Sequence, residues 1–181
     1  MSPTEKQTLL TIDYLLAGTP RQRAAYRVLT QAGIFEHLAT YHPTLTGTIP
    51  LDIDIPGSDL DILCEVYDFA PFAALVQTHY GHLPDFYQKT KALNGTPAHI
   101  SRFSYPASPF PIEIVAQPVP VREQRAFRHL CAEAALLAQG GAPARAAIRA
   151  LKLSGVKTEP AFGQYFGLEG DPFQVLLEQV Q

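Results

Sequence analysis

The chain has 181 residues, a formal net charge of −3, 46% apolar residues and 17% charged residues. This composition is typical of a folded globular protein, and the length suits one domain with a sizeable core over residues 1–181. Because phosphate contacts need a clustered excess of Lys and Arg, the charge argues against long duplex nucleic acid as a partner. A nucleotide or another small phosphate remains compatible with it.

The sequence also predicts the cellular location of the protein. It has no run of eighteen apolar residues that could span a membrane, and its N-terminus lacks the basic-then-apolar pattern of a secretion signal. Its two cysteines, Cys64 and Cys131, lie far apart in apolar surroundings. We therefore expect a cytoplasmic protein with two buried free thiols.

Helices are expected in residues 1–43. Leucine and isoleucine residues recur at helical spacing up to Gly18, which predicts a first helix. Thr19-Pro20 supplies a cap and a first-turn proline for a second helix, which Gly33 ends. A short helix over Ile34 to Thr40 is expected next.

Residues 44–117 are expected to form the core of a sheet. Strands are predicted over Thr44 to Thr48, Asp59 to Val66, Phe86 to Leu93, His99 to Phe103 and Phe110 to Ala116. A helix over residues 71–80 follows the second strand, and residues 50–57 read as a loop because of their prolines and aspartates. Asn94-Gly95 is a strong signal for a hairpin between the third and fourth strands.

Residues 118–181 are expected to form a helical tail. Helices are predicted over Val121 to Ala138, Pro143 to Leu153 and Ala161 to Phe166, with a break at Gly140-Gly141 between the first two. Asp171 is expected to cap a last helix. This order of elements predicts an α+β fold, with a mixed sheet of about five strands flanked by helices.

One stretch of the chain carries the main chemical signal. Gly47-Thr48 is followed ten residues later by Asp59-Leu60-Asp61-Ile62, where acidic and apolar residues alternate. In a strand, both carboxylates would project from one face, roughly 6–7 Å apart. Such a pair suits a hard divalent cation, which takes oxygen ligands.

This pattern resembles the signature of the nucleotidyltransferase superfamily, which includes polymerase beta-like enzymes and small minimal nucleotidyltransferases. There, a third carboxylate comes from a later strand, and Glu113 between Ile112 and Ile114 is the matching residue. The wider sequence resembles a bacterial family known as domain of unknown function 4269. The resemblance rests on GTIPLDID before SDLDI, LAGTPRQ near the start and GVKTEPAF near the end. That family brings no established substrate with it.

The resemblance implies a magnesium-dependent (or manganese-dependent) enzyme that moves a nucleotidyl group from a nucleoside triphosphate to a hydroxyl acceptor. Asp59 and Asp61 would hold the metal, and Glu113 would complete the site or deprotonate the acceptor hydroxyl. Candidate phosphate-binding residues are Gly47, Thr48, Ser58, Lys89, Arg102 and Lys157.

Several alternatives stay open at this point. The chain has Ile49-Pro50-Leu51 where many small transferases have Ser, Arg and Gly, so a non-catalytic nucleotide- or protein-binding module is the main alternative. A metal-dependent phosphoesterase would use the same acids. Asp52 and Asp54 read as loop caps, with supporting metal ligands as the second interpretation.

Some other polar and aromatic residues also have two interpretations. Arg21 and Arg23 are either solvated or part of an anion site. His79 and His82 are expected to have structural or surface roles, because too few further ligands lie near them for a zinc site. Core packing is the expected role of the aromatic residues of the short helix, with stacking on a base as the alternative; these are Phe162, Tyr165 and Phe166.

Overall fold

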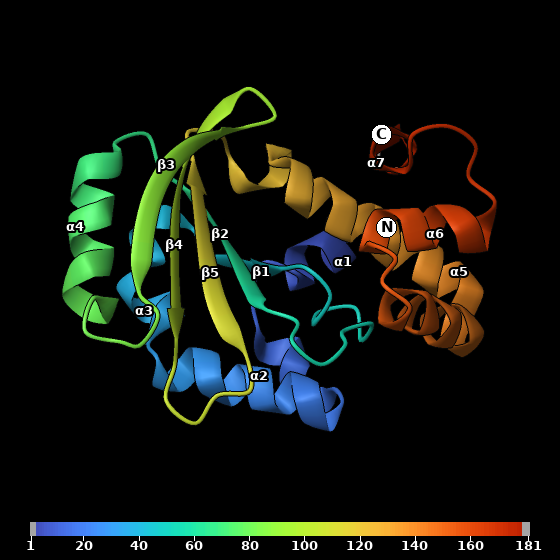
Figure 1. Cartoon of the computed structure of the whole chain (residues 1–181), viewed down its shortest axis with the longest axis horizontal. Helices are drawn as coiled ribbons and strands as arrows, with labels where there is room; N and C mark the ends of the chain where they lie inside the picture. Colours follow the sequence, from blue (N-terminus) through green and yellow to red (C-terminus); the bar gives the residue numbers. More distant parts are fainter. Residues whose placement is uncertain (1–2, 179–181) are drawn as a thin grey trace.

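The computed structural model of the chain describes residues 3–178. Its centre is a five-stranded sheet with the strand order β1-β2-β5-β4-β3 (Figure 1). The strands are β1 (Thr44–Thr46), β2 (Leu60–Glu65), β3 (Tyr87–Leu93), β4 (Thr96–Ser104) and β5 (Pro111–Gln117). Only β2 and β5 pair in parallel. The predicted α+β fold with a mixed five-stranded sheet is therefore confirmed.

One face of the sheet packs on the helices that precede β1 and follow β2. These helices are α2 (Pro20–Gln31), α3 (Ile34–His37) and α4 (Phe69–Tyr80). Residues Ile112, Ile114 and Ala116 alternate along β5 and are all buried in this core. The polar residues between them point to the opposite face, since side chains alternate along a strand.

The opposite face of the sheet meets the helical tail. Figure 1 shows α5 (Arg125–Leu153), α6 (Thr158–Phe166) and α7 (Pro172–Glu178) gathered on one side of the sheet. The predicted break in the long helix is confirmed, because Gly141 has a φ of 61° and a non-helical ψ of −151° inside α5. A short 3₁₀ helix, η3 (Val121–Glu123), leads into α5.

The N-terminal helix differs from its prediction. The structure has a short α1 (Pro3–Thr8) and a separate 3₁₀ helix, η1 (Asp13–Ala17), in place of one helix up to Gly18. Hydroxyl groups explain the interruption, since Thr8 Oγ1 donates to the Thr4 carbonyl at 3.1 Å and Thr11 Oγ1 to the Thr8 carbonyl at 3.2 Å. Threonine hydroxyls that bind nearby backbone groups compete with regular helix formation.

Other short elements and boundaries follow the local signals closely. Thr19 and Gln22 form a capping box at the start of α2. Asn94 and Gly95 both have positive φ angles, of 49° and 82°, as the expected hairpin turn requires. A further 3₁₀ helix, η2 (Ala39–Tyr41), replaces the end of the predicted helix that starts at Ile34.

The loop between β1 and β2 has no regular structure but is held from two sides. From α2, Gln22 Nε2 donates to the carbonyls of Ile49 and Pro50 at 3.0 and 3.1 Å. From α5, three cationic side chains donate to loop carbonyls, and these are Arg145, Arg149 and Lys152. Their spacing of four and three residues places them on one side of the helix. The loop that leads into β2 is therefore fixed by tertiary contacts.

Two further predictions concern the whole chain. No helix within residues 3–178 is long and apolar enough to cross a membrane. Cys64 and Cys131 are both buried and form no disulfide, as the sequence predicts.

Candidate nucleotide and metal site

The sheet aligns the candidate acids in one row. Thr46 of β1 pairs with Asp61 of β2, Asp61 pairs with Glu113 of β5, and Glu113 pairs with Arg102 of β4. Residues opposite each other on neighbouring strands project from the same face, with Cα atoms about 5 Å apart. The structure therefore brings Asp61 and Glu113 side by side, with an arginine as the next residue of the row.

Asp61 is the most perturbed carboxylate of this row. Burial, and then the negative charges of Asp59 and Glu113, raise the pKa of Asp61 to about 7, while Arg102 and Lys152 oppose the rise. In the part of the chain that the structure describes, its carboxylate has no hydrogen bond or ion pair. A carboxylate that repels its neighbours and lacks a counter-ion in contact is a favourable place for a cation.

Gly47 is shaped to fit this carboxylate. Its φ angle is +74°, and a Cβ atom at this position would lie only 2.3 Å from Asp61 Oδ2. Only glycine avoids both the strained backbone and the clash. The small-residue turn therefore makes room for the Asp61 carboxylate, a function that spacing alone does not reveal.

Arg102 occupies the space between the other two acids. Its Nη1 atom lies 3.0 Å from Asp59 Oδ2 and 3.8 Å from Glu113 Oε2. No group of three or more His, Cys, Asp or Glu side chains among residues 3–178 is arranged to hold a metal ion. The oxygen donors nevertheless fit magnesium in chemistry, because Asp61 lacks a counter-ion in contact and lies next to Glu113.

A cleft of about 920 Å³ lies over Thr46, Asp61 and Glu113, between the sheet and the helical tail, and neither Asp59 nor Arg102 is among its lining residues. Gly47, Thr48, Asp61 and Glu113 line it on the sheet side. We call the opposite side, formed by α5, α6 and α7, the helical wall, and its lining residues include His129, Glu133 and Glu159. The volume is within the range of small-molecule sites, about 300–1,000 Å³.

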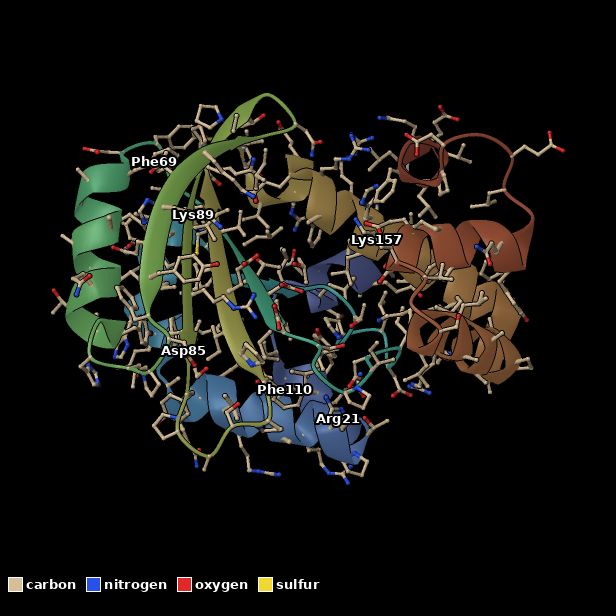
Figure 2. All side chains as sticks on the ribbon, viewed as in Figure 1. Arg21, Phe69, Asp85, Lys89, Phe110 and Lys157 are labelled. Atoms are coloured by element: carbon tan, nitrogen blue, oxygen red, sulfur yellow. The ribbon has the colours of Figure 1, made fainter. Side chains whose placement is uncertain are left out.

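The remaining candidate phosphate-binding residues do not gather in the cleft. Ser58 accepts a hydrogen bond from the Ile55 N–H at 3.0 Å, so its hydroxyl closes the turn before β2. Lys89 lies on the edge strand β3, where its ammonium group is 5.1 Å from the centre of the Tyr87 ring (Figure 2). Lys157 is exposed at the N-cap of α6. Neither lysine is among the residues that line the cleft.

Asp52 and Asp54 have a different role from the predicted loop caps. Asp52 pairs with Arg149 at 3.0 Å, and the buried Asp54 pairs with Arg21. Figure 2 shows Arg21 next to Phe110, and its guanidinium lies 4.7 Å from the centre of that ring. The cap prediction is wrong because the partners of both acids come from distant parts of the chain. Arg21 holds Asp54 through Nε while 42% of its side chain is exposed, and its Nη2 has no hydrogen-bond partner among the described residues.

The predicted structural role is borne out for His79, and the predicted core packing is borne out for Phe162 but not for Tyr165. His79 stacks on His37 with 3.8 Å between the ring centres, and α4 ends at Tyr80, before His82. Phe162 is fully buried in the core, while Tyr165 of the same helix is 39% exposed.

Sequence reasoning missed the helical wall and the burial of Lys152. Lys152 is only 8% exposed, donates to the Ile53 carbonyl at 2.8 Å and has its pKa lowered by burial to about 8. Glu133 is 5% exposed. A signal for Glu133 was present, since it is the only charged residue in the apolar run from Leu130 to Ala138. A charged residue on a buried helix face needs a partner or a function.

Comparison with solved structures identifies the class of fold. A chain in the structure of a GLD-2/RNP-8 complex matches with a TM-score of 0.51 and 12% identity, over 88% of this chain and 69% of that one. The Cid1 poly(U) polymerase with MgGTP bound matches at 0.48 and 13%, over 77% of this chain and 42% of its own. The polymerase core of TRAMP, an RNA surveillance complex, matches at 0.48 and 14%, over 95% and 54%. This chain has the nucleotidyltransferase-like fold, and identities this low show the fold alone.

The family follows from the sequence profile. The family described as a domain of unknown function (DUF4269) matches residues 27–179, which is most of the chain. The chain therefore belongs to this family. A search of curated proteins gives no significant match. The chain spans about half or less of the two polymerase chains above, so their activities are not transferred to it.

Proposed function

We propose that the protein is a magnesium-dependent nucleotidyltransferase that acts on a nucleoside triphosphate and a hydroxyl acceptor. The observation that carries this proposal is the register of Asp61 with Glu113 beneath the cleft. Two adjacent carboxylates on a rigid sheet, facing a cavity of nucleotide size, are suited to phosphoryl transfer assisted by a divalent cation.

In this proposal Asp61 and Glu113 hold the cation, together with Asp59 once its contact with Arg102 is released. A bound magnesium ion supplies Lewis acidity to the phosphate oxygens and removes the repulsion among the acids. Arg102, freed from Asp59, then pairs with a phosphate, for which its planar guanidinium is well suited. Gly47 and Thr48 offer close backbone approach and a hydroxyl donor.

The chemical step in the proposal is a displacement at the α-phosphorus. The acceptor hydroxyl oxygen forms a bond to this phosphorus, the bond to the pyrophosphate oxygen breaks, and pyrophosphate leaves with that electron pair. The hydroxyl proton passes to a carboxylate of the row, with Glu113 as the candidate base.

Isothermal titration with each nucleoside triphosphate, with and without magnesium, tests the proposal. Wild-type protein should bind at least one triphosphate only with magnesium, and Asp61→Asn should weaken this binding by about 100-fold or more, because it removes a negatively charged ligand. Asp13→Asn, at an exposed position in η1, is the matched control and should bind like wild type. Absence of nucleotide binding by the wild type would refute the proposal.

A non-catalytic nucleotide-binding module is the second candidate, and one contact favours it. Arg102 already neutralises Asp59 and approaches Glu113, so these acids do not need a cation for charge balance. In a module, nucleotide binding would be independent of magnesium and would persist in Asp61→Asn. Pyrophosphate release in the presence of a range of hydroxyl compounds would decide for the enzyme.

A further inference from the structure

The helical wall contains a buried carboxylate that no described residue contacts as a counter-ion. Glu133 lies on α5, is 5% exposed and lines the cleft opposite the sheet. Across the described residues 3–178, its side chain makes no hydrogen bond and no ion pair. Buried carboxylates almost always have such partners, because transfer of an unpaired charge out of water is strongly unfavourable.

The electrostatic surroundings of Glu133 disfavour its negatively charged form. Burial, and then the charge of Glu159, raise the pKa of Glu133 well above its ordinary value, and only Lys152 acts in the opposite direction. Lys152 is engaged elsewhere, since its ammonium group donates to the Ile53 carbonyl at 2.8 Å. Its charge also acts on Asp54 and Asp61. One buried ammonium group therefore serves three acids.

The other cations of this wall are also committed. Arg125 donates to the Phe173 carbonyl at 3.1 Å, and Arg128 donates to the Leu177 carbonyl at 3.3 Å. Both arginines thus tie α5 to α7 and stay directed at its backbone.

His129 lies between the backbone of α7 and the second acid of the wall. Its Nε2 lies 2.9 Å from the Phe173 carbonyl, and because a carbonyl oxygen only accepts, Nε2 must be the protonated nitrogen. Its Nδ1 lies 3.6 Å from Glu159 Oε1. Glu159 lies in the first turn of α6 and lines the same cleft as Glu133.

We propose that Glu133 and Glu159 form an acceptor subsite that binds a protonated amino group, so that the acceptor is a hydroxyl compound that also carries an amine. This inference rests on the proposed nucleotidyl transfer and deepens it. An ammonium group brings the donors and the positive charge that Glu133 lacks. With the amine on the helical wall, the acceptor hydroxyl would face Asp61 and Glu113 across the same cleft.

Titration of ¹⁵N-labelled full-length protein, followed by amide resonances, tests this subsite directly. The probes are two matched pairs at neutral pH, glucosamine against glucose and putrescine against butanediol. We expect saturable shifts with the amines, centred on the residues around Glu133 and Glu159, and no such shifts with the alcohols. Glu133→Gln should weaken amine binding about tenfold or more, the size of one charge-assisted hydrogen bond.

Two variants guard this test against structural damage. Glu159→Gln alters a partly exposed side chain and should also weaken amine binding. Glu169→Gln, at an exposed position beyond α6, is the matched control and should bind like wild type. Equal shifts with glucose and glucosamine, or unchanged amine affinity in both subsite variants, would overturn the proposal. So would the absence of saturable shifts up to about 10 mM amine, since a working subsite should reach millimolar affinity.

Manganese titration separates an organic cation from a metal ion. A paramagnetic Mn²⁺ ion broadens nearby resonances, and we expect the broadening at Asp61 and Glu113. Broadening centred on Glu133 and Glu159, with displacement of glucosamine, would show a metal site there and overturn the amine subsite. The two proposals can be refuted independently. If the protein binds amines but no nucleotide in the presence of magnesium, the amine subsite is supported and the nucleotidyltransferase proposal is refuted.

Discussion

The two walls of the cleft place acidic groups by different means. On the sheet wall, strand register aligns Asp61 with Glu113, and Arg102 comes next in the same row as a counter-ion. On the helical wall, Glu133 and Glu159 come from separate helices, and no cation contacts Glu133 in the described chain. The sheet wall therefore contains a counter-ion for its acids, whereas Glu133 on the helical wall has no counter-ion in contact.

This difference separates the roles that the two walls can have. A row of acids with an arginine can exchange its internal ion pair for a metal and phosphates, because the arginine has a new anionic partner when released. A buried acid without a partner gains from any cation that enters. The balance of acidic and basic side chains therefore differs between the two walls. The chain's net charge of −3 shows neither arrangement.

The largest expected effect on stability concerns Lys152, which links the two walls. Lys152→Met should lower the free energy of unfolding by about 3 kcal/mol, since it removes a buried cation from three acids and leaves the Ile53 carbonyl unpaired. Urea unfolding at neutral pH measures this change. Arg145→Met is the matched control, because its longer bond of 3.3 Å to the Leu51 carbonyl is partly exposed. A loss no larger than that of the control would mean that Lys152 does not hold the loop.

The second prediction uses pH to test the acid excess on the helical wall. The folded pKa of Glu133 is raised, so the folded state binds more protons than the unfolded state above the ordinary carboxyl pKa. Stability should therefore fall as the pH rises from about 5 to 7, and Glu133→Gln should remove roughly 1 to 2 kcal/mol of that fall.

The pH window for this test ends below the titration of Lys152, whose pKa is lowered to about 8. Thermal or urea unfolding at several pH values gives the slope, and Glu169→Gln should keep the slope of the wild type. A Glu133→Gln slope equal to that of the wild type would show that the pKa of Glu133 is not raised in the folded protein.

The sheet wall was predictable from the sequence, and the helical wall was not. Period-two alternation predicted that Asp61 and Glu113 project from one face of the sheet, and the pairing of β2 with β5 agrees. Asp59, which was predicted on the same strand as Asp61, precedes β2. Helix caps such as Thr19 and the Asn94-Gly95 turn are local signals too. Each of these local features depends only on residues within a few positions of one another, so it can be predicted from the sequence.

Contacts between distant residues explain what the sequence did not show. The partner of Asp52 is Arg149, 97 positions away, and no local pattern predicts that pairing. The juxtaposition of Glu133 with Glu159 depends on how α6 folds back on α5 after the kink at Gly141. Local patterns could show only that Glu133 is unusual among apolar neighbours, not what it faces.

The smallest predicted effect isolates one contact on the sheet wall. Gly47 and Gly57 have similar positive φ angles of 74° and 87°, but a Cβ atom would lie 2.3 Å from Asp61 Oδ2 at Gly47 and would have no atom within 4 Å at Gly57. Both Gly47→Ala and Gly57→Ala therefore introduce backbone strain of about 1 kcal/mol, and only Gly47→Ala adds a clash with the Asp61 carboxylate.

We expect Gly47→Ala to be less stable than Gly57→Ala by about 1 kcal/mol, since the Asp61 carboxylate must shift to admit the new methyl group. Magnesium-dependent nucleotide binding should weaken in Gly47→Ala and stay unchanged in Gly57→Ala, because only the first displaces a proposed metal ligand. Urea unfolding and titration of the two variants side by side measure both differences. Equal losses in stability would mean that the sheet wall yields to the methyl group, and its row of acids would then be less rigid than the register of β2 and β5 implies.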